Sequence, residues 1–205
     1  MASTVALSMT KWSLDLASQL IRADVRLHNH ETIRDDMAII FVVNHFTRLE
    51  TLLLPYVINK YTGKEVWGLA AAQLFKGRIG QFLRSTGTVS TSDPDRDRII
   101  VHSLLTGEHP WMIFPEGAMI KDKKVIDHTG KFSIYSDGKR RPPHTGAAVL
   151  ALRAEFYRHK MSCLDARPGG DAALAQAMEH FALPPDADVL SKRTVIIPVN
   201  ITYFP

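Results

Sequence analysis

Two short segments of the chain carry residue types that can move a proton. In the first, His45 stands five positions before Glu50, and in the second, Glu116 lies between Pro115 and Gly117. If a helix begins near residue 47, Glu50 on its first turn can reach back to His45. A carboxylate against an imidazole fixes the tautomer of the ring and suits it to take a proton from a hydroxyl. The spacing therefore predicts a general base at His45.

Each segment also has a simpler interpretation. Residues 47–50 read Thr-Arg-Leu-Glu, which is a capping box in which Glu50 would serve only to close the helix start. In the second segment, Pro115 fixes the backbone and Gly117 permits a sharp turn, so that Glu116 is presented to accept hydrogen bonds from substrate hydroxyls. The alternative for Glu116 is an ordinary exposed turn.

Both segments follow apolar runs of strand length, 37–44 and 111–114, and the first is typical of a strand buried on both faces of a parallel sheet. The alternation of strands and helices predicts an α/β fold, a single domain with a mostly parallel central sheet flanked by helices. In such sheets ligands bind where the strands end at their carboxyl edge. The further elements expected are helices at 47–59 (kinked or ended early by Pro55), 73–84, 92–105, 145–159 and 171–181, and strands at 66–70, 88–91 (an edge) and 195–203, where Pro198 indicates an edge or bulge.

The first 30 residues are expected to form a separate element. Apolar residues recur at steps of three and four from Val5 to Leu27, which is typical of an amphipathic helix. Such a helix can lie in a membrane interface or pack on the domain core. We expect residues 1–30 to be this helix and 31–205 to be the domain. Because the chain stops directly after an expected core strand, we also expect the domain to lack C-terminal elements.

The net charge of +4 is concentrated in one part of the 205 residues. Residues 121–141 hold seven bases and three acids, and the rest of the chain is neutral. This basic segment suits anionic lipid headgroups, a phosphorylated substrate or nucleic acid, and the alternative is a solvated loop. Its only aromatic residues are Phe132 and Tyr135, which argues against nucleic acid. The single Cys163 excludes an internal disulfide and a cysteine-rich zinc cluster.

Taken together, the His-x4-acid element and the Phe-Pro-Glu-Gly segment at 114–117 resemble the glycerolipid acyltransferase family, whose best-known members are the 1-acylglycerol-3-phosphate acyltransferases. The resemblance runs from about residue 39 to residue 199. It continues at 197–199, Ile-Pro-Val, which is similar to the fourth motif of the family, and Gly87 occupies the place of the second motif.

The resemblance implies transfer of a fatty acyl group from the thioester of acyl-CoA or acyl carrier protein to a hydroxyl of a glycerophospholipid such as 1-acylglycerol-3-phosphate. It assigns His45 as the base and Glu50 as the residue that orients it, and it implies no metal and no cofactor beyond the acyl donor. The partners it implies are the acyl donor, a lipid acceptor and a membrane surface, with no nucleic acid, and the location is peripheral on the cytoplasmic face of a membrane, or cytoplasmic. The residues expected to bind the acceptor are Glu116, Gly117, Arg48, Arg96, Lys121 and Lys124, and those expected at the acyl chain are Pro198 and Val199.

The chain departs from the family pattern at three places. Glu50 replaces the usual aspartate, as is more typical of the acyltransferases that finish lipid A. Asp93 and Ala118-Met119 stand where the family usually has an arginine and Thr-Arg. The phosphate-binding arginines are therefore missing from their usual places, so nearby bases replace them or the acceptor has no phosphate there. The alternatives are an acyltransferase on a lipid A-type, amino-acid lipid or sterol-like acceptor, and a membrane lipid-binding module without turnover.

Overall fold

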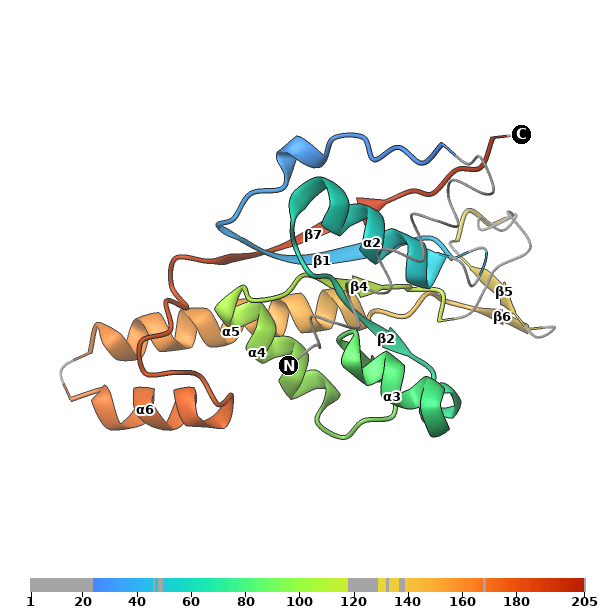
Figure 1. The fold of residues 1–205 in the computed structure, drawn as a ribbon. Helices are drawn as coiled ribbons and strands as arrows, with labels where there is room; N and C mark the ends of the chain where they lie inside the picture. The colour runs from blue at the N-terminus through green and yellow to red at the C-terminus, as the bar shows by residue number, and fades with distance from the viewer. Residues whose placement is uncertain are drawn as a thin grey trace.

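The computed structural model describes residues 24–45, 47, 50–117, 129–131, 133–136, 139–167 and 169–204 (Figure 1). Strands and helices alternate along most of this part of the chain. The strands are β1 (Met37–Val43), β2 (Trp67–Ala70), β3 (Thr88–Ser90), β4 (Trp111–Ile113), β5 (Ile134–Ser136), β6 (Lys139–Arg141) and β7 (Arg193–Val199). The helices are α2 (Glu50–Thr62), α3 (Gly77–Ser85), α4 (Arg96–Thr106), α5 (Gly146–Asp165) and α6 (Asp171–His180), with short 3-10 turns η1 (His30–Thr32) and η2 (Ala72–Phe75).

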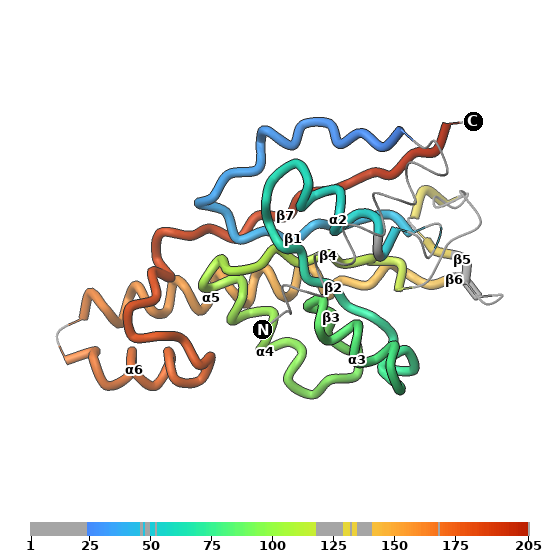
Figure 2. Tube along the Cα trace, in the orientation of Figure 1, coloured from blue at the N-terminus to red at the C-terminus, as the bar shows by residue number. Residues whose placement is uncertain are grey.

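Five strands form one parallel sheet in the order β3-β2-β4-β1-β7. This arrangement confirms the predicted α/β domain with a parallel sheet. In Figure 2, β3 and α3 lie on one side of the molecule and β7 leads to the C-terminal end on the other. Within the described sheet β7 pairs only with β1, so Pro198 stands on an edge strand, one of the two positions predicted for it.

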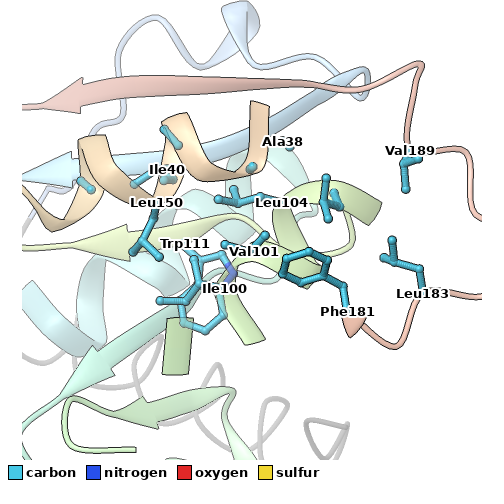
Figure 3. Close-up of a cluster of buried hydrophobic side chains, with 14 of the residues drawn as sticks. Ala38, Ile40, Ile100, Val101, Leu104, Trp111, Leu150, Phe181, Leu183 and Val189 are labelled. Carbon is cyan, nitrogen blue, oxygen red and sulfur yellow. The ribbon is translucent and has the colours of Figure 1, made fainter. Parts of the chain in front are cut away.

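Strand β1 is the centre of the core because its side chains are buried on both faces of the sheet. Ala38 and Ile40 pack against α4 and α5 on one face, in the cluster that Figure 3 shows around Trp111. On the other face, Ile39 and Phe41 pack against α2. Fully burying an aliphatic or aromatic side chain stabilises the fold by about 1.5–3 kcal/mol, so this strand fixes where its exit segment lies.

A buried arginine connects α5 to the elements beside it. The Arg158 guanidinium donates to the main-chain oxygens of Val189 and Leu104, each at 2.7 Å, and to the Thr194 hydroxyl at 3.2 Å. Glu155 is its ion-pair partner. Burial lowers the pKa of Arg158 below its usual value, and the Glu155 carboxylate acts in the opposite direction. Arg158 therefore bonds α4, the segment before β7 and β7 itself to α5.

Several element boundaries differ from the sequence predictions. Pro55 does not end α2, which continues to Thr62. The missing N–H of Pro55 costs the helix one hydrogen bond, and the apolar face of α2 that packs against the sheet keeps the helix in place. The helix expected at 73–84 is divided into η2 and α3, since Gly77 has a φ of 55° and interrupts the helical backbone. Helix α4 begins at Arg96, later than the start expected at residue 92.

One further pair of strands, and the ends of one strand and one helix, also differ from the predictions. The antiparallel β5–β6 hairpin was not predicted, because its second strand is three consecutive bases without apolar alternation. The last strand ends at Val199 and the chain continues to residue 204 without regular structure. Helix α5 continues to Asp165, beyond the predicted end at residue 159.

The predicted N-terminal amphipathic helix lies largely outside the described residues. Residues 24–28, which the prediction included, have no helical structure. Within the part of the chain that the structure describes, every helix is too short or too polar to cross a bilayer.

Candidate active site

Three neighbouring strands of the sheet end at the same edge, and their exits contain the candidate residues. Because β1 lies between β4 and β7, the segment after β1 has the exits of β4 and β7 on either side. His45 follows β1, Glu116 follows β4 and Tyr203 follows β7. In Figure 1, β1, β4 and β7 all run toward the end of the molecule that holds the β5–β6 hairpin and the C-terminal end. The fold therefore brings together segments that are far apart in the chain.

His45 and Glu50 are in direct contact. The Nδ1 atom of His45 lies 3.1 Å from Oε2 of Glu50. The glutamate side chain is 1% exposed and the histidine side chain 13% exposed, so water hardly competes for this bond. The Phe114 ring lies 4.2 Å from the imidazole, centroid to centroid, and holds it on a second side. With Nδ1 donating to the carboxylate, Nε2 is the nitrogen that can accept a proton.

The second carboxylate oxygen of Glu50 also has a partner. The Tyr203 hydroxyl donates to Oε1 of Glu50 at 3.0 Å, and the Thr47 hydroxyl lies 3.4 Å from the same phenol oxygen. Glu50 is the first residue of α2, yet its two oxygens contact a histidine and a tyrosine. The capping interpretation, in which Glu50 only closes the helix start, does not account for these contacts.

Glu116 adds a second carboxylate to this group. It is half-buried in the turn after β4, and burial raises the pKa of its carboxyl above the ordinary value of 4.5. The main-chain amides of Glu116 and His45 and the charge of His45 act in the opposite direction, and the charge of Glu50 raises the pKa further. Oε2 of Glu116 is buried and has no hydrogen-bond partner among the described residues. This oxygen is therefore a buried hydrogen-bond acceptor without a donor among these residues.

The turn that presents Glu116 requires a glycine. Gly117 has a φ of 66°, and a Cβ at this position would lie 2.7 Å from the His144 ring. The main-chain amide of His144 donates to the Pro115 oxygen at 2.7 Å, which fastens the segment before α5 to the same turn. A side chain at position 117 would therefore strain the backbone and displace the imidazole.

Of the other residues predicted to bind the acceptor, Arg96 is described by the structure, and it is not brought into this group. Arg96 is held by Asp97, with nitrogen to oxygen distances of 2.7 and 2.8 Å, and by the Thr91 main-chain oxygen at 2.9 Å. It follows β3, which β2 and β4 separate from β1. Arg48, Lys121 and Lys124 lie outside the described residues.

The two residues predicted for the acyl chain lie on β7, in register with β1. Pro198 pairs with Val42 and is exposed, whereas Val199 pairs with Val43 and packs against the apolar cluster on the α2 face. That cluster also contains Phe114, the residue that contacts the His45 ring. Apolar surface from β7 and β4 thus continues up to the imidazole.

Sequence reasoning did not single out Tyr203 and Asn44, which the structure brings to these segments. Asn44 exchanges two hydrogen bonds with the Ile201 main chain, at 2.7 and 3.1 Å, and so holds the segment that carries Tyr203. Sequence reasoning also did not single out Arg84, which lies away from these segments and lines a hollow of about 190 Å³ beside β3 together with Asp93, the residue at the place of the family arginine. Within the described residues no cluster of three metal-ligating side chains occurs.

The comparisons with known proteins give a family and no close relative. The model of the family described as Acyltransferase matches residues 24–202, which is most of the chain and includes His45, Glu50 and Glu116 but not Tyr203. No curated protein and no solved structure matches the chain. The family match agrees with the resemblance that His45, Glu50 and the 114–117 segment indicate, so the chain belongs to the acyltransferase family of the glycerolipid type.

Proposed function

We propose that this protein is an O-acyltransferase that moves a fatty acyl group from the thioester of acyl-CoA or acyl carrier protein to a hydroxyl of a lipid acceptor. The observation that carries the proposal is the 3.1 Å contact between His45 Nδ1 and the buried Glu50 carboxylate, beside Glu116. Membership of the acyltransferase family supports the reaction class. The acyl donor, the acceptor and the roles of the residues are part of the proposal.

In this proposal His45 is the general base. Its Nε2 takes the proton of the acceptor hydroxyl while the hydroxyl oxygen attacks the carbonyl carbon of the thioester. The tetrahedral intermediate then expels the sulfur, and the proton passes from Nε2 to the leaving thiolate. The products are an ester and a free thiol. Glu50 holds the ring in the tautomer that leaves Nε2 unprotonated, and its charge stabilises the imidazolium that forms in the transition state.

Glu116 would hold the acceptor. Its unpartnered Oε2 can accept a hydrogen bond from a hydroxyl of the acceptor, and its nearness to His45 places that acceptor at the base. The acyl chain would lie along the apolar surface near Val199 and Phe114. The acceptor would be met at a membrane surface, which the basic segment 121–141 favours through its charge.

A second acceptor class is favoured by one specific observation. Asp93 stands at the place of the family's phosphate-binding arginine, and Arg96 is already held by Asp97 and by a main-chain oxygen. An acceptor without a phosphate at that place fits this arrangement. The two acceptor classes are distinguished by offering lysophosphatidic acid and monoacylglycerol at equal acyl-CoA concentration and measuring which of the two is acylated.

The test of the proposal is thiol release that depends on the acceptor. Purified protein is mixed with an acyl-CoA, lysophosphatidic acid and a thiol reagent, and the rate is compared with His45→Ala and with His159→Ala, a change at an exposed histidine on α5. We expect His45→Ala to abolish acceptor-dependent release and His159→Ala to leave it unchanged. Release that persists at the wild-type rate in His45→Ala contradicts the mechanism, and liposome binding without transfer by any donor and acceptor supports a binding module instead.

A further inference from the structure

The segment that follows β7 returns to the exit of β1 and contacts the buried carboxylate there. Asn44, directly before His45, donates to the Ile201 main-chain oxygen at 3.1 Å, and its own side-chain oxygen accepts from the Ile201 amide at 2.7 Å. These two bonds fix the path of residues 200–204 over the exit of β1. Tyr203 then lies two residues beyond the attachment point.

The Tyr203 residue is half-exposed, but its hydroxyl contacts the buried carboxylate of Glu50. It donates to Oε1 of Glu50 at 3.0 Å, while Oε2 of the same carboxylate contacts His45. The pKa of the Tyr203 phenol is raised above its ordinary value of 10.0, first by burial and also by Glu50. The phenol therefore keeps its proton near neutral pH and remains a donor.

A carboxylate with only one of its oxygens engaged can rotate about its last torsion. Because the two donors approach opposite oxygens of Glu50, they fix the plane of the carboxylate and with it the direction in which Oε2 meets His45. Hydrogen bonds between a neutral donor and a charged acceptor are among the stronger ones in proteins. The tyrosine thus acts on the histidine through the glutamate.

We propose that Tyr203 is a positioning residue of the His45–Glu50 pair, held in place by the Asn44 bonds to Ile201. The inference rests on the proposed function, because it is the general base that the tyrosine positions. It adds to His45, Glu50 and Glu116 a fourth residue, which comes from a third strand exit. It also assigns a role in the chemistry to the segment after β7.

The first experiment is a double-mutant cycle in acyl transfer. Tyr203→Phe keeps the ring and removes only the hydroxyl, and Tyr61→Phe is the matched control on α2. We expect Tyr203→Phe to lower kcat about tenfold with KM unchanged, the loss typical of a removed hydrogen bond to a charged group. In the Glu50→Ala background, which removes the side-chain group that His45 and Tyr203 both contact, the same change should alter kcat less than twofold, because its route to His45 is then absent. An equal loss in both backgrounds, or no loss in the wild type, overturns the inference.

The second experiment does not depend on activity. In ¹⁵N spectra of the histidine side chains, with His45 assigned by comparison with His45→Gln, the wild type should show the Nδ1–H tautomer. Tyr203→Phe should convert it to a mixture with the Nε2–H tautomer, whereas Tyr61→Phe should not. An unchanged His45 tautomer in folded Tyr203→Phe overturns the inference even if the wild type transfers no acyl group. A changed tautomer in a protein without transfer supports the positioning role and contradicts only the proposed function.

Discussion

Replacement of Glu50 by glutamine changes one atom at the centre of the proposed site. Glu50→Gln keeps the size of a side chain that is 1% exposed and removes its charge. The amide oxygen can still accept from His45 Nδ1, and the amide nitrogen then faces the Tyr203 hydroxyl, which can turn its hydrogen and accept instead. The geometry is therefore kept while the charge that stabilises the imidazolium is lost.

The expected loss follows from the contact distance. Two unit charges about 4 Å apart attract by about 4 kcal/mol at an effective dielectric constant of about 20. The neutral hydrogen bond that remains returns about 1 kcal/mol. The transition state thus loses about 3 kcal/mol, which lowers kcat by about 10²-fold.

The assay is steady-state thiol release with saturating acyl-CoA and a lipid acceptor. Glu179→Gln, at an exposed glutamate on α6, is the matched control and should keep the wild-type rate. Thermal unfolding of both variants checks that the fold is intact. A folded Glu50→Gln variant with a kcat within threefold of wild type would refute the reasoning, because the carboxylate would then have no part in the reaction.

Three further predictions concern the turn after β4 and the core. Burial raises the pKa of Glu116 in the folded state. Its protonated form therefore stabilises the fold below pH 4.5, and this contribution is lost as pH rises through the folded pKa. Glu116→Gln, which cannot ionise, should gain stability relative to wild type between pH 4 and pH 7 in urea unfolding, while KM for the acceptor rises. Gly117→Ala should lower the unfolding free energy by about 1–3 kcal/mol and raise KM for the acceptor, because it strains the backbone and displaces His144. Gly63→Ala is the control, since Gly63 has the same sign of φ but open space around it, and it should leave KM unchanged. Arg158→Met should lower the unfolding free energy by about 2–4 kcal/mol with KM unchanged, because it leaves two buried main-chain oxygens without their donor, and a loss under 1 kcal/mol would contradict that role.

The central strands and the carboxylate beside the histidine were predictable because their signals are local. The apolar run at 37–43 has the length of a buried strand, and the spacing of five positions lets Glu50 on the first turn of a helix reach back to His45. Glu116 was predictable for the same reason, since Pro115 and Gly117 define the turn from within three residues.

The contacts that the sequence could not reveal join distant parts of the chain. Tyr203 and Glu50 are 153 positions apart, and they meet only because β7 pairs with β1. Strand order is a property of packing, so nothing local to 200–204 distinguishes Tyr203 from an exposed aromatic residue. Arg96 shows the converse case: its type and place suggested phosphate binding, but the adjacent Asp97 already holds the guanidinium.

The central claim is that His45 removes the proton of the acceptor hydroxyl, and single-turnover acyl transfer tests it most directly. Enzyme in excess is mixed with an acyl-CoA labelled in its acyl group and with the lipid acceptor, and the labelled ester is quantified over time in wild type and His45→Gln. The account predicts that the wild type forms the ester and that folded His45→Gln forms it at least 10²-fold more slowly. Ester formation by His45→Gln at the wild-type rate would contradict the account.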